Sequence, residues 1–278
     1  MITVGRRTFL GTAASLVGSG VLSTSVTLPE RSIAAPATAG SAQYGVKALF
    51  FDVFGTLVDW RTGVAREAES ILKPRGYQID WPAFADAWRA EYAPGLAEVS
   101  SGRIPFARLD VLHRRMLGRI LPRFGLQELP EDALHQLNLA WHRLDAWPDV
   151  APGFTRLGGK YLLAPVSNGN ISLIADLARR NHLRFDAILG AEIAGDYKPK
   201  PRVYLASAEA FDLSPAECMM VSAAAHPTDI EGAHAAGLRT ASVARPDEFG
   251  QGKAESIPKV PVDITTKTLL DLADQLGA

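Results

Sequence analysis

Short apolar runs that end at polar residues alternate, along most of this chain, with segments of helical periodicity. The first run covers residues 47–51 and stops at Asp52, with a glycine at Gly55. This pattern is typical of a buried strand that turns at a carboxylate. Further strand-like runs lie at residues 161–166, 187–189, 219–222 and 240–243. Because strands that alternate with helices favour right-handed crossovers, the sequence predicts a parallel sheet.

A block of residues 60–147 interrupts this alternation directly after the first strand. Its apolar residues recur at spacings of three and four, which predicts helices and no strand. The stripes are Val64, Ala68, Ile71 and Leu72; Phe84, Trp88 and Tyr92; Leu109, Leu112, Met116 and Ile120; and Leu134, Leu137, Trp141 and Leu144. We interpret Trp88 and Trp141 as packing residues. The expected fold is α/β, a doubly wound parallel sheet (a Rossmann-like core of residues 46–59 and 148–278) with residues 60–147 as an inserted helical cap domain.

The first 40 residues differ in kind from the rest of the chain. Paired arginines at positions 6–7 precede an uncharged stretch that runs to Leu28, and residues 37–39 have the small side chains that a signal peptidase requires. This order predicts a cleavable export signal over residues 1–39, and the arginine pair is similar to that of twin-arginine signals. We therefore expect an exported, periplasmic protein. The alternative is an anchor helix, which the many Gly, Ser and Thr residues disfavour.

Composition limits the partners of the chain. Of 278 residues 47% are hydrophobic, and the formal net charge is -1. This balance gives no electrostatic reason to expect nucleic acid or an anionic membrane surface as a partner, and no membrane is expected to bind the chain once the signal is removed. The one cysteine, Cys218, excludes an internal disulfide. It lies in the apolar run 218–221, so we interpret it as core packing rather than as a nucleophile.

Polar residues follow the predicted strands at several points. Asp52 comes after the first strand, Ser167 and Asn168 after the second, residues 196–201 after the third and residues 222–229 after the fourth. Ligands of open parallel sheets bind at the carboxyl ends of the strands. The sequence therefore predicts one polar crevice beneath the cap.

These segments resemble the four motifs of the haloacid dehalogenase superfamily, in order and in spacing. The matching segments are residues 51–57 (FDVFGTL), 166–169 (VSNG), 197–199 (YKP) and the loop that ends at Asp229. The likeness covers residues 46–245 and is greatest for the type II, or L-2-haloacid, dehalogenase group. It extends to residues 58–61, which follow the first motif, and to residues 87–89 in the predicted cap.

The resemblance implies hydrolytic dehalogenation of small 2-haloalkanoic acids to 2-hydroxy acids, without metal or other cofactor. Asp52 would attack C2 in line with the carbon–halogen bond and form an aspartyl ester, which water would then hydrolyse. The implied partners are the 2-halo acid and water. A homodimer is a further expectation, because relatives in this group are commonly dimers.

The resemblance also assigns catalytic roles. Lys198 would keep the nucleophile ionised, since a nearby cation favours the charged carboxylate. Arg89 would face the leaving halide and orient the substrate; a surface position is the alternative. Thr56 and Tyr204 would steady the nucleophile and the lysine, although Tyr204 could equally pack on a helix face. Asp229 would hold the lysine, or serve as the N-cap of the helix that it begins.

The substrate carboxylate has its own expected partners. Ser167 and Asn168 would bind it through hydroxyl and backbone N–H groups, helped by the N–H groups of Val53 and Phe54. The alternative for Ser167 and Asn168 is a strand-end turn that caps a helix, and both roles are physically compatible.

Two sequence features distinguish this chain from the phosphatases of the superfamily. Those enzymes carry a second aspartate two residues after the nucleophile to protonate the leaving alkoxide, whereas this chain has Phe54. Positioned acid catalysis is worth about 10²–10⁴-fold. The second feature concerns the metal that the phosphatases bind: Mg²⁺ prefers oxygen ligands, and Asp52 and Asp229 alone make a poor site for it. A phosphatase-like hydrolase and a non-catalytic binding relative remain the alternatives.

The fourth motif departs from the best-known type II dehalogenases, which carry Ser and Asn there to handle the hydrolytic water. Here the loop is alanine-rich and offers His226 instead. We hypothesise that His226 accepts a proton from water. A hydrogen-bonded loop histidine is the alternative.

Overall fold

The structure, a computed structural model, describes residues 44–250 and 259–278. The export signal predicted for residues 1–39 lies outside the described residues. Within the two described ranges, no helix combines the length and the apolar character needed to cross a bilayer.

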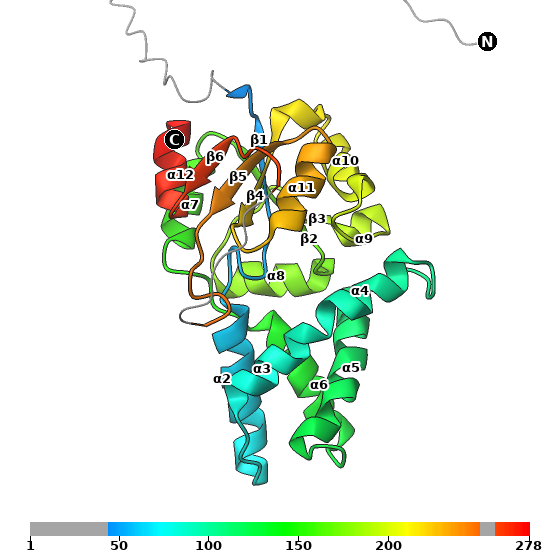
Figure 1. Cartoon of the computed structure of the whole chain (residues 1–278). Coiled ribbons are helices and arrows are strands. Elements are labelled where there is room, and N and C mark those ends of the chain that lie inside the picture. The colour runs from blue at the N-terminus through cyan, green and yellow to red at the C-terminus, as the bar shows by residue number, and fades with distance from the viewer. Residues whose placement is uncertain (1–43, 251–258) are drawn as a thin grey trace, which may run out of the picture. The chain divides into compact units, whose positions relative to one another are not determined.

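Six parallel strands form one sheet in the order β3-β2-β1-β4-β5-β6 (Figure 1). This order reverses at β1, as in doubly wound folds, and confirms the predicted fold class. The strands are β1 (Ala48–Phe51), β2 (Leu162–Ser167), β3 (Leu189–Gly190), β4 (Cys218–Ala223), β5 (Arg239–Val243) and β6 (Ile264–Thr266).

Helices cover both faces of the sheet because alternate residues of each strand point to opposite sides. In β1, Ala48 and Phe50 belong to one apolar cluster, and Leu49 and Phe51 belong to another. The first cluster includes residues of α10 (Pro201–Glu209) and α11 (Pro227–Ala235); the second includes residues of α7 (Val150–Leu157), α8 (Ile171–Arg180) and α12 (Leu269–Leu276). The short α9 (Ala191–Ala194) and η4 (Pro215–Glu217) lie at the ends of β3 and β4.

The inserted block is helical, as predicted, and it lies beside the carboxyl ends of the strands (Figure 1). Trp88 and Trp141 are buried in its interior, which confirms their interpretation as packing residues. Helix α4 was not predicted separately, because α3 and α4 meet at Glu91 without a loop. The elements are α2 (Trp60–Leu72), η1 (Lys73–Arg75), α3 (Trp81–Ala90), α4 (Tyr92–Ser100), α5 (Leu109–Ile120), η2 (Leu121–Phe124), α6 (Glu131–Asn138) and η3 (Leu139–His142).

A polar cluster joins the cap to the core. Asp110 of α5 accepts one hydrogen bond from the Asn170 amide at 2.8 Å and contacts the His142 ring at 3.1 Å. The other ring nitrogen of His142 lies 2.9 Å from Asp176 of α8. Burial would lower the pKa of His142, but the two carboxylates raise it. The cluster therefore holds the cap against α8.

Two further details compare with the sequence predictions. Strand β6 was not predicted, because it is only three residues long and one of them is exposed. Cys218 is completely buried in β4, and burial raises the pKa of its thiol to about 12. Its interpretation as a packing residue is thus confirmed.

Candidate active site

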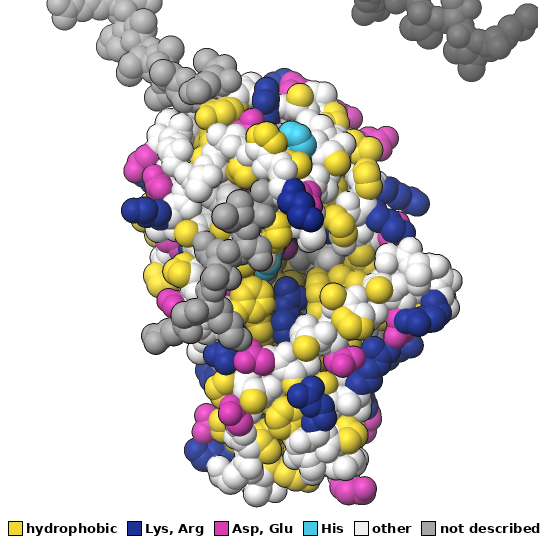
Figure 2. Space-filling model, in the orientation of Figure 1, with side chains coloured by type: hydrophobic (Ala, Val, Ile, Leu, Met, Phe, Trp, Pro, Cys, Tyr) yellow, Lys and Arg dark blue, Asp and Glu magenta, His cyan; other side chains and the backbone are white. Residues whose placement is uncertain are grey.

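A cavity of about 560 Å³ lies between the cap and the carboxyl ends of the strands, a volume suited to small ligands. The space-filling view shows a hollow with largely hydrophobic walls between the two parts of the fold (Figure 2). Residues from both parts line the cavity, among them Asp52, Phe54, Arg89, Tyr92, Asn168, Lys198, His226 and Asp229. The predicted crevice beneath the cap is therefore present.

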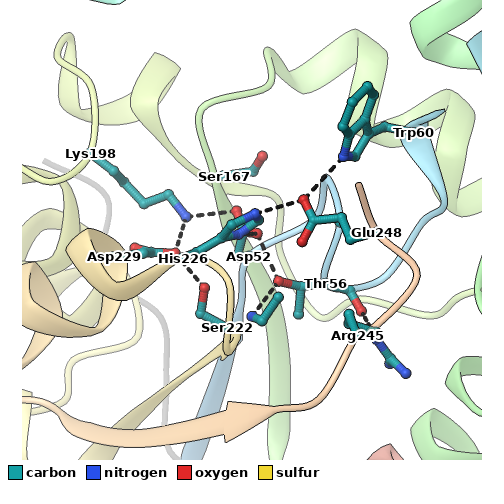
Figure 3. A network of polar contacts seen from close by, with 12 residues as sticks. Asp52, Thr56, Trp60, Ser167, Lys198, Ser222, His226, Asp229, Arg245 and Glu248 are labelled. Atoms are coloured by element: carbon teal, nitrogen blue, oxygen red, sulfur yellow. Dashed lines mark hydrogen bonds and ion pairs between the residues drawn. The ribbon is translucent and has the colours of Figure 1, made fainter. Parts of the chain in front are cut away.

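Asp52 sits where β1 ends, and its backbone N–H donates to Val221 O on the neighbouring strand at 3.0 Å. The two carboxylate oxygens of Asp52 have different partners (Figure 3). Oδ1 accepts from Lys198 Nζ at 2.9 Å, whereas Oδ2 accepts from Thr56 Oγ1 at 2.8 Å and lies 3.1 Å from His226 Nδ1. Burial alone would raise the pKa of Asp52, but Lys198 and then His226 hold it well below its usual range. Asp52 is therefore ionised.

Lys198 lies between two carboxylates. Its Nζ atom is 2.9 Å from Asp52 Oδ1 and 2.7 Å from Asp229 Oδ2. Ser222 Oγ donates to the same Asp229 oxygen at 3.0 Å, and Tyr204 OH donates to Asp229 Oδ1 at 2.6 Å. Burial would lower the pKa of Lys198, but the charges of Asp229 and Asp52 raise it. The lysine is therefore a fixed cation beside the nucleophile.

The structure bears on the alternative roles that the sequence left open for Asp229 and Tyr204. Asp229 lies inside the first turn of α11, whose N-cap position is His226, so Asp229 is not the N-cap. Tyr204 is buried on α10 and also bonds Asp229, so packing and hydrogen bonding coexist in this side chain. Burial, followed by the charge of Asp229, raises the pKa of its hydroxyl.

His226 lies on the other side of Asp52 from Lys198, between the carboxylates of Asp52 and Glu248. Its Nδ1 is 3.1 Å from Asp52 Oδ2, and its Nε2 is 2.8 Å from Glu248 Oε1. Burial would lower the pKa of His226, but its bonds to Asp52 and Glu248 raise it to about 9. The loop histidine is thus hydrogen-bonded, and its partner is the nucleophile candidate itself.

Glu248 was not predicted from the sequence, although it is completely buried beside the site. Trp60 Nε1 donates to Glu248 Oε1 at 3.0 Å, and a Cβ atom at Gly55 would overlap the Glu248 carboxylate. Arg245 Nε, which donates to Thr56 O at 2.9 Å, anchors the turn that carries Glu248. This turn follows the carboxyl end of β5. Because ligands of parallel sheets bind at the carboxyl ends of the strands, the position of Glu248 after a predicted strand was a signal that could have identified it as a site residue.

Arg89 of α3 faces the cavity from the cap. Its guanidinium lies over the Tyr92 ring at 4.2 Å and over the Trp60 ring at 5.5 Å. No carboxylate of the described ranges forms an ion pair with it. Aromatic faces hold a cation in place without neutralising it, so Arg89 presents an uncompensated positive charge to the cavity.

The predicted carboxylate-binding residues divide into two groups. Asn168 lines the cavity, and its Oδ1 accepts the backbone N–H of Lys198 at 2.9 Å, which leaves its amide NH₂ as a donor. Ser167 is fully buried behind the cavity, and its Oγ accepts the N–H of Gly169 at 3.0 Å. Phe54 lines the cavity and Val53 precedes it along the chain; in the described part of the chain, no acceptor bonds their backbone N–H groups.

The donor set does not fit Mg²⁺. The two carboxylates expected to hold it, Asp52 and Asp229, both bind the Lys198 ammonium, and a divalent cation between them would meet that charge. Over residues 44–250 and 259–278, no cluster of three His, Cys, Asp or Glu side chains is arranged to hold a metal.

Comparison with known proteins identifies the class. Residues 46–237 match the haloacid dehalogenase-like hydrolases, and the chain belongs to this family. It is 29% identical to (S)-2-haloacid dehalogenase 1 of Pseudomonas sp. (strain CBS-3), over 73% of this chain and 88% of that protein. The crystal structures of a defluorinating L-2-haloacid dehalogenase and of a second L-2-haloacid dehalogenase match it with TM-scores of 0.80 and 0.79. Their identities are 41% and 39%, over 84% of this chain and 96% and 99% of theirs.

Proposed function

We propose that this hydrolase converts small L-2-halo carboxylic acids to 2-hydroxy acids, with Asp52 as nucleophile. The observation that carries the proposal is a buried, ionised carboxylate at the floor of a small cavity, with the guanidinium of Arg89, which pairs with no carboxylate of the described residues, above it. The haloacid dehalogenases that the chain matches support the same reaction.

Asp52 Oδ1 is the oxygen best suited to attack. Among the described residues it accepts one hydrogen bond, from Lys198, whereas Oδ2 has two partners. An oxygen that accepts fewer hydrogen bonds keeps a lone pair free to attack C2 of the substrate. The halide leaves as a stable anion, so the first step needs neither a proton nor a metal.

The cavity supplies donors for both negative ends of the substrate. Arg89 would hold the halogen from the cap side, where its charge assists departure as halide. The amide of Asn168 and the N–H groups of Val53 and Phe54 would bind the substrate carboxylate, with Ser167 fixing the turn that carries Asn168. Binding at both ends would place C2 near Oδ1.

The phosphatase alternative has weaker support. Phe54 lies where an acid would be needed to protonate a leaving alkoxide, and the two carboxylates expected to hold Mg²⁺, Asp52 and Asp229, both bind the Lys198 ammonium. A non-catalytic relative would not need an ionised carboxylate opposite a guanidinium that no carboxylate in the described part of the chain neutralises.

Ion chromatography of halide release tests the proposal. We expect chloride from L-2-chloropropionate and bromide from the bromo acid, unchanged by a chelator, and none with Asp52→Asn. Fluoroacetate is a further arm, because one matched structure is that of a defluorinating enzyme. Release of phosphate from phosphate esters without release of any halide would contradict the proposal.

A further inference from the structure

We propose that the charged imidazole of His226, held by Glu248, forms with the Thr56 hydroxyl an oxyanion hole for hydrolysis of the Asp52 ester. The inference rests on the proposed function, since it concerns the second step of that reaction. It makes His226 an electrophile that keeps its proton, and Glu248 a positioning residue.

The geometry around Asp52 Oδ2 is that of an oxyanion hole. Thr56 Oγ1 lies 2.8 Å and His226 Nδ1 3.1 Å from this oxygen (Figure 3). Donors at 2.7–3.1 Å are suited to stabilise a developing oxyanion. Thr56 Oγ1 also accepts the N–H of Ala223 at 2.8 Å, so its own hydrogen is directed to Oδ2.

The surroundings of His226 require both ring nitrogens to carry hydrogen. Nδ1 faces the carboxylate of Asp52 and Nε2 faces the carboxylate of Glu248, and ionised carboxylates only accept hydrogen bonds. The other charged groups near the ring are Lys198, beyond Asp52, Asp229 on its own helix, and Arg89 across the cavity. The raised pKa of His226, about 9, agrees with a charged ring.

Glu248 matters most after the first step, when esterification removes the charge of Asp52. A buried imidazolium beside a neutral ester would lose its proton unless another anion remained close by. Glu248 remains 2.8 Å from Nε2, fully buried and held by Trp60 Nε1 at 3.0 Å. The imidazolium therefore persists through ester hydrolysis, the step in which the carbonyl oxygen Oδ2 becomes negative.

The step balances without a further reactant. Water oxygen bonds to Cγ of Asp52 while the carbonyl π pair moves to Oδ2, where Thr56 and His226 stabilise it. The pair returns as the bond from Cγ to the ester oxygen breaks, and that oxygen takes one proton of the attacking water, giving the 2-hydroxy acid. The other proton leaves to solvent as Asp52 ionises, and His226 ends the step as it began.

Burst kinetics of His226→Gln and Glu248→Gln test the inference, with His234→Gln on the same helix and Glu209→Gln as matched controls. Both control residues are exposed. With L-2-chloropropionate, His226→Gln should release one chloride per site and then slow by about 10²–10³-fold, the usual loss of an oxyanion donor. Mass spectrometry should detect the ester on the peptide that carries Asp52. The controls should show no burst and no ester.

The pH dependence of ester decay separates an electrophile from a base. It is measured in Glu248→Gln, where the ester should accumulate, and is compared with the pH dependence of turnover in the wild type. An imidazolium electrophile loses activity as pH rises through its pKa, whereas a neutral base loses activity as pH falls. Glu248→Gln removes an anion that raises the pKa of His226. The loss of activity with rising pH should therefore occur at a lower pH in this variant than in the wild type, and acidification should restore the activity of the variant. A purely structural defect would not be restored in this way.

Two different failures are distinguishable. Ester decay that falls with acidification, or multiple turnovers at the wild-type rate in both variants with no ester, would overturn the inference alone. The first of these results would support His226 as a base. No halide from the wild type and no ester in any variant would overturn the proposed function itself.

Discussion

The two sides of Asp52 have the same plan, a cation between two carboxylates. On one side Lys198 lies between Asp52 and Asp229, and on the other His226 lies between Asp52 and Glu248. A lysine with a pKa raised above its usual value keeps its charge at any working pH, whereas the pKa of His226, about 9, is within experimental reach. The first side therefore fixes the charge of the nucleophile, and the second can be switched off by pH.

Asp52→Asn removes the member that both sides share. We expect halide release to fall by about 10⁴-fold or more, as when a catalytic nucleophile or its partner is removed. Ion chromatography measures the loss, and Asp247→Asn, at an exposed carboxylate, is the control. Substantial turnover in Asp52→Asn would mean that another group attacks C2, and the comparison would lose its basis.

Lys198→Met breaks the first side and should cost about 10²–10³-fold, because a fixed charge next to the reacting atom is lost. It should also raise the pKa of Asp52, which Lys198 now holds down. The acid limb of activity should therefore move to higher pH, while no ester accumulates. Lys267→Met, at an exposed site, is the control. An unchanged acid limb would show that Lys198 does not set the charge of Asp52.

Arg89→Met removes a cation that belongs to neither side. We expect a loss of about 10²-fold, the usual cost of a misplaced substrate, with a higher KM and no ester, because the first step is the one that slows. Steady-state halide release and mass spectrometry check this. An accumulated ester in Arg89→Met would mean that the guanidinium also acts in ester hydrolysis, the step assigned to His226.

The smallest expected effect is on stability. The pKa of His226 is raised from 6.5 to about 9 in the folded protein. The stabilisation is therefore fully present below pH 6.5 and is lost as pH rises through about 9. Urea unfolding should show about 1–3 kcal/mol more loss over this range in the wild type than in His226→Gln. Equal losses in the two proteins would mean that Asp52 and Glu248 do not hold the imidazolium.

The sequence predicted most of the fold and one side of the site. The short apolar runs predicted five of the six strands, and the apolar residues spaced three and four apart predicted the helical cap, because strands and helices differ in periodicity. The short β6 carried no such signal. Asp52, Thr56, Lys198 and Asp229 followed from motifs of fixed spacing, and Tyr204 from a position that matches the family. The structure places all five in one connected cluster.

The other side could not be predicted with the same certainty. Glu248 lies in a turn outside the four motifs, and only the folded chain shows that Arg245 anchors this turn beside Thr56. Its partner Trp60, which begins α2, was noted in the sequence only as part of the segment 58–61 that resembles the type II group. Side chains brought together from a loop and a cap helix leave no common spacing in the sequence, so contacts such as Trp60–Glu248 emerge only from tertiary structure.

Gly55 adds a constraint that concerns which residues the site tolerates. Its φ of 89° is a backbone conformation that residues with a Cβ atom rarely adopt, so any replacement is strained. In addition, the Glu248 carboxylate occupies the volume of any Cβ at this position. A larger residue could enter only together with a shorter side chain at position 248, so the two positions are expected to change jointly, and a library that varies one at a time should recover glycine alone.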